Sequence, residues 1–164
     1  GSYMEIIEAK TAALFASAAE VSAIVAGRPA EEIAALDTYG RELGLAFQLV
    51  DDALDYGGLA QSLGKNTGDD FREGKVTLPV VLALKKSSQA DKQFWARVMA
   101  EGEQTEADFE TALELLHRHD ALKATLAMAE DKARTAQQAL SVFPDNKWKT
   151  ALSDLAEFVV QRAS

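Results

Sequence analysis

The sequence predicts an all-α protein, built as a bundle of about seven helices. Apolar residues make up 48% of its 164 residues, whereas aromatic residues make up only 7%. Alanine and leucine are abundant, and this mixture favours packed helices over a β-sheet. Only three prolines occur, at positions 29, 79 and 144, so long uninterrupted helices are possible. No segment has a convincing strand pattern, and the length fits one domain.

The first expected helix covers residues 3–26, and Gly27 follows its last turn. From position 6 onward this segment carries only three charged residues, Glu8, Lys10 and Glu20. A helix that is apolar nearly all round must be enclosed by other helices. We therefore expect this segment to lie in the interior of a bundle.

The second expected helix begins at Pro29 and ends near Tyr56. Proline is favoured in the first turn of a helix, and Glu31 and Glu32 follow where the helix dipole stabilises negative charge. The pair Gly57-Gly58 breaks the helix.

A polar, glycine-rich connection covers residues 63–75, and five shorter helices are expected after it. Thr77 and Pro79 suit the start of the third helix. The run from Thr105 to Asp108 resembles a capping box for the fifth, with Asp in place of Glu or Gln. The five expected segments are 77–86, 89–101, one that starts at 105, 120–142 and one in the region that Pro144 opens.

Charge and composition exclude several classes of function. The net charge of −9 argues against nucleic-acid binding, which needs clustered Lys and Arg. The chain has no cysteine, which excludes disulfides, Cys-ligated zinc and thiol catalysis. The most apolar stretch, 11–27, is interrupted by Glu20 and is shorter than a membrane-spanning helix requires. We expect a soluble, cytoplasmic protein without stable membrane insertion, and we interpret Gly1-Ser2 as a cloning scar.

Four polar residues follow one face of the second expected helix. Gln48, Asp51, Asp52 and Asp55 have offsets of 0, 3, 4 and 7, and their neighbours are largely apolar. Like charges at this spacing repel, and no Lys or Arg lies four residues away to compensate. Magnesium prefers oxygen ligands and is usually bound by one or two carboxylates together with substrate phosphates. The pattern predicts a magnesium site, and the alternative is a solvated acidic face.

Lys10 is the second unusual residue, because it lies in the apolar first segment. A lysine in a buried helix is costly unless it is paired or faces a polar cavity. It could instead extend its ammonium toward solvent or pair with Glu8.

The third feature is a loop that carries two lysines, Lys65 and Lys75, within residues 64–79. Lysine is a good partner for phosphate, but the order of Gly, Lys and Ser/Thr is not that of a P-loop. A loop of this kind can also be merely solvated. Together with the carboxylates and Lys10, it indicates a site for a diphosphate. His117 and His119 lie two residues apart, on different faces of a helix, and are not expected to be ligands.

These features resemble the trans-polyprenyl diphosphate synthase family, in family order across most of the chain. The segment Phe47–Asp55 resembles its second aspartate-rich motif, and Lys10-Thr11 resembles its Lys-Thr pair. Gly64-Lys65 and Phe71–Pro79 resemble its downstream loop, and Ala156–Arg162 resembles the C-terminal segment of long-chain members. The loop and tail are most similar to octaprenyl and decaprenyl diphosphate synthases.

The resemblance implies an isoprenoid-synthase helical bundle, usually a homodimer, that elongates an allylic diphosphate with isopentenyl diphosphate. The product would be a long-chain polyprenyl diphosphate, such as a precursor of quinone side chains. The resemblance also implies a role for each site residue. Magnesium would be held by Asp51, Asp52 and Asp55; diphosphate would contact Lys10, Thr11, Gln48, Lys65 and Lys75; and Lys10, Thr11 and Gln48 would be catalytic.

One departure separates the chain from the family pattern. The first aspartate-rich motif and the paired arginines that follow it are absent. Asp69-Asp70 is not a replacement, because it follows the second motif. We therefore expect residues 3–164 to be the C-terminal part of a polyprenyl synthetase domain, truncated and inactive alone. An apolar surface should be exposed where the other helices would pack.

Two other interpretations remain at this stage. The chain could be a non-catalytic regulatory or interaction subunit that keeps the fold, although the retained Asp, Lys and Gln residues argue against this. Terpene cyclases share the helical logic, but the loop followed by Thr77-Leu78-Pro79 fits chain elongation better.

Overall fold

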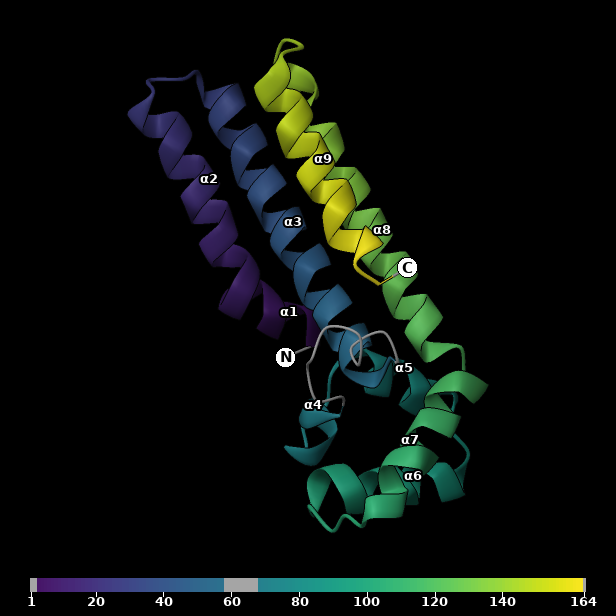
Figure 1. Cartoon of the computed structure of the whole chain (residues 1–164). Helices are drawn as coiled ribbons and strands as arrows, with labels where there is room; N and C mark the ends of the chain where they lie inside the picture. The colour runs from purple at the N-terminus through teal and green to yellow at the C-terminus, as the bar shows by residue number, and fades with distance from the viewer. Residues whose placement is uncertain (1–2, 58–67, 164) are drawn as a thin grey trace. The chain divides into compact units, whose positions relative to one another are not determined.

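The computed structural model describes residues 3–57 and 68–163, and helices account for most of both ranges (Figure 1). These two ranges contain no β-strand, which confirms the all-α prediction. None of their helices combines the length and the apolar character that crossing a membrane requires. The chain divides into two compact units, Gly1–Val50 with Ala127–Ser164 (unit 1) and Asp51–Leu126 (unit 2).

The elements of unit 1 come from both ends of the chain, and two long helices run on into unit 2. Tyr56 and Leu126, for example, belong to helices whose other parts lie in unit 1. The elements are α1 (Tyr3–Ile7), a π-helical turn (Glu8–Ala12), α2 (Ala13–Val25), α3 (Ala30–Tyr56), α8 (Ala121–Ala139), a 3₁₀ turn (Leu140–Val142) and α9 (Lys147–Gln161).

Unit 2 is built from shorter helices. They are α4 (Asp69–Arg72), α5 (Leu78–Lys86), α6 (Gln89–Trp95), a π-helical turn (Ala96–Ala100) and α7 (Glu106–Arg118). The predicted capping box of α7 is confirmed, because the Thr105 amide donates to Asp108 at 2.7 Å. Each of the seven expected segments has a counterpart here or in unit 1, and α4 is an additional single turn.

Polar contacts join the helices of unit 1, which lie side by side (Figure 1). The Tyr39 hydroxyl of α3 donates to the carbonyl of Leu152 in α9, at 2.8 Å. The Lys132 ammonium of α8 pairs with Glu42 of α3 at 2.9 Å. The Gln137 side chain of α8 also donates to α9. Burial of the Tyr39 hydroxyl raises its pKa to about 12.

Two glycines allow α3 to approach the preceding helical segment at backbone distance. A Cβ atom on Gly40 would clash with the carbonyl of Phe15, and one on Gly44 would lie 2.8 Å from the Cα of Ala12. Both positions therefore need a residue without a side chain. This contact brings the π-helical turn against α3, one turn before Gln48.

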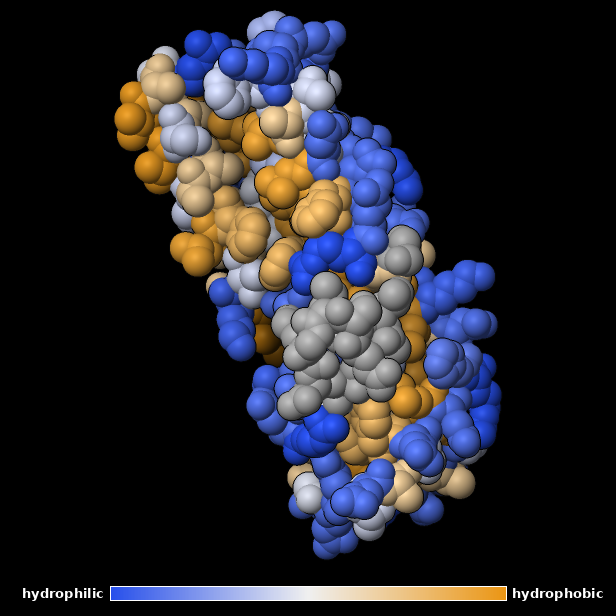
Figure 2. Space-filling model, viewed as in Figure 1, coloured by the Kyte–Doolittle hydropathy of each residue, from blue (hydrophilic) through white to orange (hydrophobic). Residues whose placement is uncertain are grey.

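The outer face of α2 is exposed. Leu14 and Val25 keep 72% and 83% of their surface accessible, and Val21 and Ile24 are also more than half exposed. Figure 2 shows these apolar residues gathered along α2. The prediction that this segment is enclosed is wrong for this chain, whereas the predicted exposed apolar surface is present.

Unit 2 has its own core, in which large apolar side chains from α4 to α8 meet. Phe71, Trp95 and Leu116 are almost completely buried there. Beside this core, the Arg97 guanidinium donates to both carboxylate oxygens of Asp108, at 2.7 and 3.0 Å. Asp108 therefore joins the start of α7 to the π-helical turn that follows α6.

Substituting Gly44→Ala should destabilise the protein, because the new methyl group meets backbone atoms that cannot rotate away. Overpacking of this kind costs about 1–3 kcal/mol. Urea unfolding would measure the change. In the control Gly57→Ala, the new Cβ would lie 3.4 Å from its nearest neighbour, the Ala53 carbonyl. The control should change stability by less than about 0.5 kcal/mol, and an equal effect of both substitutions would contradict the close-contact explanation.

Substituting Asp108→Asn should reduce stability in a pH-dependent way. Hydrogen bonds from Arg97 and from the Thr105 amide hold the pKa of Asp108 well below its ordinary value. The ionised carboxylate therefore stabilises the folded state above the unfolded pKa of about 4, and this contribution is lost as the pH falls toward the folded value. Urea unfolding at several pH values should show a difference that narrows in acid. A pH-independent difference, as expected for exposed Asp154→Asn, would contradict this explanation.

Candidate active site

The structure brings together two of the predicted catalytic residues in unit 1. The Thr11 hydroxyl, in the π-helical turn, donates to the side-chain oxygen of Gln48 in α3, at 3.2 Å. Both side chains are partly buried. The close packing at Gly44, four residues before Gln48, makes this contact possible.

Lys10 lies beside this pair in the sequence, but its side chain is exposed. The prediction of an interior lysine is therefore wrong for this chain. The physical reason is that the outer face of the first helical segment is uncovered, so the ammonium keeps its contact with water and loses no hydration.

The three predicted metal ligands differ in burial. Asp52 is only 1% exposed, whereas Asp51 and Asp55 are half-buried. In the part of the chain that the structure describes, no group of three or more His, Asp or Glu side chains is arranged to hold a metal ion. The predicted three-carboxylate site is therefore not assembled here. Asp51 and Asp55 still suit a magnesium ion that takes most of its ligands from diphosphate and water.

Asp55 already organises the segment that follows it. Its carboxylate accepts the backbone N–H groups of Asp69 and Asp70 at 3.2 and 3.0 Å, and its carbonyl accepts the Gly68 N–H at 2.7 Å. Burial and the negative charge of Asp70 raise the pKa of Asp55, and the two N–H groups oppose that shift. A carboxylate with excess negative charge beside it is suited to bind a cation.

The sequence gave no indication of this arrangement, although Gly68 was a usable signal. Gly68 has a φ of 83°, in the left-handed region that favours glycine. A Cβ at this position would lie 2.6 Å from the Phe109 ring. A glycine directly before two aspartates thus marks the tight turn that brings α4 against Asp55.

Lys75 does not project freely for a phosphate. Its ammonium pairs with Glu73 at 2.6 Å and with Asp70 at 3.2 Å, and these hydrogen bonds raise its pKa. Lys65, the other predicted loop ligand, lies outside the described residues.

Arg162, at the end of the segment that resembles the family's C-terminus, lies near the predicted site residues of unit 1. Its guanidinium is 5.0 Å from the centre of the Phe47 ring, within cation–π range. Phe47 also contacts Phe15 of α2, with 6.0 Å between ring centres. The chain's C-terminal end is thereby placed beside the residue that precedes Gln48.

Two cavities lie near these elements, one in each unit. The cavity of unit 1 has a volume of about 430 Å³ and a nearly wholly apolar lining between α2 and α3. It is lined by Leu14, Phe15, Ala18, Ala19, Tyr39, Gly40 and Leu43.

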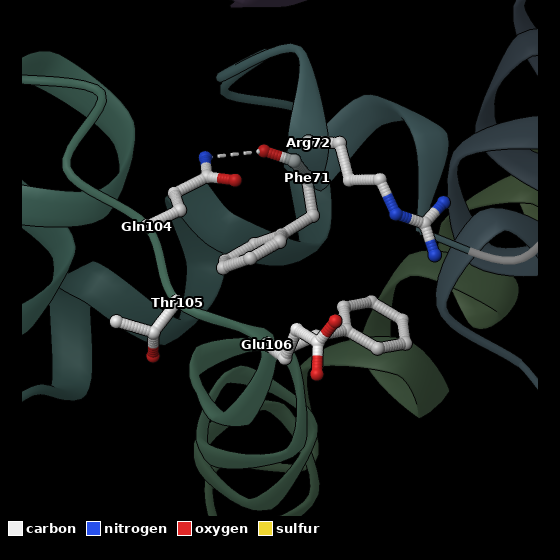
Figure 3. A pocket seen from close by; sticks show the side chains of 6 residues that line it. Phe71, Arg72, Gln104, Thr105 and Glu106 are labelled. Carbon is white, nitrogen blue, oxygen red and sulfur yellow. Dashed lines mark hydrogen bonds between the residues drawn. The ribbon is translucent and has the colours of Figure 1, made fainter.

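The cavity of unit 2 has a volume of about 450 Å³ and a mixed lining (Figure 3). The Gln104 side chain donates to the Phe71 carbonyl at 2.8 Å on one side of it. Arg72 and Glu106 supply its charged groups, and Thr105 and Phe109 complete the lining.

Comparison with known proteins decides the family. The sequence profile described as "Polyprenyl synthetase" matches residues 1–116. This chain belongs to the polyprenyl synthetase family. It is 43% identical over 160 residues to octaprenyl diphosphate synthase of Escherichia coli (strain K12), covering 98% of this chain and 49% of that relative. It is 42% identical to short chain isoprenyl diphosphate synthase of Methanothermobacter thermautotrophicus, with the same coverage.

Solved structures of polyprenyl synthases share the fold. A decaprenyl diphosphate synthase from Rhodobacter capsulatus matches with a TM-score of 0.93 and 46% identity, covering 99% of this chain and 50% of that one. A polyprenyl synthase from Caulobacter crescentus CB15, complexed with calcium and isoprenyl diphosphate, matches with a TM-score of 0.91 and 54% identity. It is covered over 49% of its length, so this polyprenyl synthetase chain spans about half of the relatives it matches.

Magnesium should bind weakly to this chain alone and more tightly when inorganic diphosphate is present. Only two half-buried carboxylates, Asp51 and Asp55, are available, and diphosphate supplies the further oxygen ligands. Isothermal calorimetry with and without diphosphate would measure this. Asp51→Asn should weaken the ternary binding about tenfold or more. Asp131→Asn, an exposed carboxylate on α8, is the control, and tight magnesium binding without diphosphate would contradict the two-carboxylate site.

Proposed function

We propose that this chain is the part of a trans-polyprenyl diphosphate synthase that carries the second aspartate-rich motif. The observation that carries the proposal is the hydrogen bond between Thr11 and Gln48. It joins, from two separate elements, the two side chains expected to face the reacting carbons. A polyprenyl synthetase relative of known structure, from Caulobacter crescentus, is described with calcium and isoprenyl diphosphate, and this supports a substrate of the same class here.

The reaction in this proposal is head-to-tail chain elongation. The carbon–oxygen bond of an allylic diphosphate breaks, and inorganic diphosphate leaves with the bonding electrons. The double bond of isopentenyl diphosphate attacks the allylic carbocation and forms the new carbon–carbon bond. A proton is then lost to the released diphosphate, which restores a double bond and leaves a longer allylic diphosphate.

The residues of unit 1 would act on the reacting groups. Thr11 would stabilise developing charge near the allylic carbon, and Gln48 would orient the homoallylic substrate. Their mutual hydrogen bond fixes both side chains before substrate binds, which reduces the reorganisation needed in the transition state. Lys10, with its exposed ammonium, and Lys65 would bind the allylic diphosphate. The apolar cavity between α2 and α3 is suited to an isoprenoid chain.

The acidic end of α3 would hold the metal. Asp51 and Asp55 would bind Mg²⁺, and Asp52 would assist directly or through water. The bound Mg²⁺ would neutralise diphosphate and make it a better leaving group. Lys75 would hold Asp70 in place, and it would bind phosphate only after leaving its carboxylate partners.

The 164-residue chain would be inactive alone, because it covers half the length of its relatives. We propose that a polypeptide equivalent to the remaining half supplies the opposing carboxylates, that the complete enzyme is a homodimer, and that it works in the cytoplasm. The exposed apolar face of α2 would contact those additional helices.

The second candidate function is a non-catalytic interaction subunit. The exposed side chains of α2 favour it, since such a surface also suits a protein partner. A relative from Geobacillus stearothermophilus, 33% identical, is named as component 2 of a heptaprenyl diphosphate synthase, which indicates an assembly of more than one component. An interaction subunit would tolerate loss of Thr11 and Gln48, whereas an enzyme would not.

Elongation assays would separate the two candidates. This chain alone, with farnesyl diphosphate, isopentenyl diphosphate and Mg²⁺, should form no product. Co-expression with the half of the Caulobacter crescentus relative that this chain does not match should restore activity. In that complex, Thr11→Val should lower kcat about a hundredfold, because the variant loses the hydroxyl but keeps the shape.

The matched control is Thr135→Val, an exposed threonine on α8 whose hydroxyl bonds within its own helix at 3.0 Å. It should leave elongation unchanged. Robust product formation by this chain alone would contradict the claim of inactivity. A restored complex in which Thr11→Val keeps full activity would favour the interaction subunit.

A further inference from the structure

Two buried hydroxyl groups in unit 2 have no hydrogen-bond partner among the described residues. Tyr56, the last residue of α3, is 3% exposed, and Thr77, directly before α5, is 6% exposed. Neither the Tyr56 hydroxyl nor the Thr77 hydroxyl is paired within those residues. Thr77 occupies the N-cap position of α5, yet its hydroxyl makes no capping bond. Buried polar groups without partners are rare and costly, so each one needs an explanation.

The two hydroxyls occupy the same place in the fold, beside a group of carboxylates. They face each other without the alignment of a hydrogen bond. Burial, followed by the charges of Asp55 and Asp70, raises the pKa of Tyr56, and a smaller contribution comes from Asp52. The hydroxyl pair therefore adjoins the acidic end of α3 and the start of α4.

Proton counting distinguishes the species that could lie between these groups. A cation would be bound by lone pairs of the hydroxyl oxygens, and both O–H protons would still lack an acceptor. A water molecule can accept those protons and donate its own to a carboxylate. Water therefore satisfies every group, whereas a cation does not.

We propose that the Tyr56 and Thr77 hydroxyls bind one buried water molecule, which donates to the carboxylates of Asp55 and Asp70. This water would connect the end of α3, the start of α4 and the start of α5. Asp55 already accepts the N–H groups of Asp69 and Asp70, so the water would fix the same carboxylate from a second direction.

Tyr56 and Thr77 would thereby be positioning residues for the acidic site. Ligands that are oriented by a second layer of hydrogen bonds bind metals more tightly, because less ordering is needed on binding. This positioning role rests on the proposed function, which assigns Asp55 to magnesium. The water site itself does not depend on that assignment.

A crystal structure of this chain would test the water site directly. We expect density for one water within hydrogen-bond distance of the Tyr56 and Thr77 hydroxyls. The water should be absent or displaced in Tyr56→Phe and in Thr77→Val, each of which removes one hydroxyl and keeps the shape. A direct hydrogen bond between the two hydroxyls with no water, or a metal ion in its place, would overturn the proposal.

Calorimetry with Mg²⁺ and inorganic diphosphate would test the positioning role. Tyr56→Phe and Thr77→Val should each weaken binding about tenfold. Thr77→Ser, which retains the hydroxyl, should bind like the unchanged chain. The matched control is Thr125→Val, because Thr125 is fully buried in α8 and its hydroxyl bonds to the Ala121 carbonyl at 2.9 Å.

The outcomes separate the two levels of inference. Equal binding by folded Tyr56→Phe and by the unchanged chain would overturn the positioning role. An equal loss in Thr125→Val would assign the effect to stability and would also overturn it. If the unchanged chain binds no magnesium diphosphate, the proposed function and the positioning role both fail, and the crystal structure still decides the water site.

Discussion

The arrangement of unit 1 depends on the backbone contact between α3 and the helical segment before it. Gly40 and Gly44 allow this contact, because any side chain there would meet the backbone of Phe15 or Ala12. The same contact places the π-helical turn one turn from Gln48, and the Thr11 hydroxyl reaches its partner from that turn. A larger residue at Gly44 would therefore separate the catalytic pair as well as loosen the packing.

The acidic end of α3 shows a different constraint, because one carboxylate has two tasks. Asp55 holds the backbone of α4 and is also the expected magnesium ligand. The two tasks are compatible, since each carboxylate oxygen has two lone pairs. They also mean that metal binding and the position of the segment after residue 67 are physically linked. Lys75 and Asp70 extend the same network through their ion pair.

The exposed face of α2 shows how far hydrophobicity alone can predict burial. The apolar pattern of the first helical segment correctly indicates a surface that is suited to be covered. It does not identify the covering polypeptide, and in this chain Leu14 and Val25 face solvent. The same fact explains why Lys10 is exposed instead of interior. Burial depends on every element that packs on a helix, whereas the pattern reports only on the helix itself.

The sequence by itself determined the helical class, the expected helical segments, the capping box at Thr105 and the family, because each depends on local spacing or on a run of adjacent residues. It also predicted the pairing of Thr11 with Gln48 at one site, through the family resemblance. Only the tertiary structure showed that Asp52 is buried, that Asp55 holds α4, and that the hydroxyls of Tyr56 and Thr77 meet. These features join residues that are far apart in the sequence, and periodicity within one helix carries no information about such contacts.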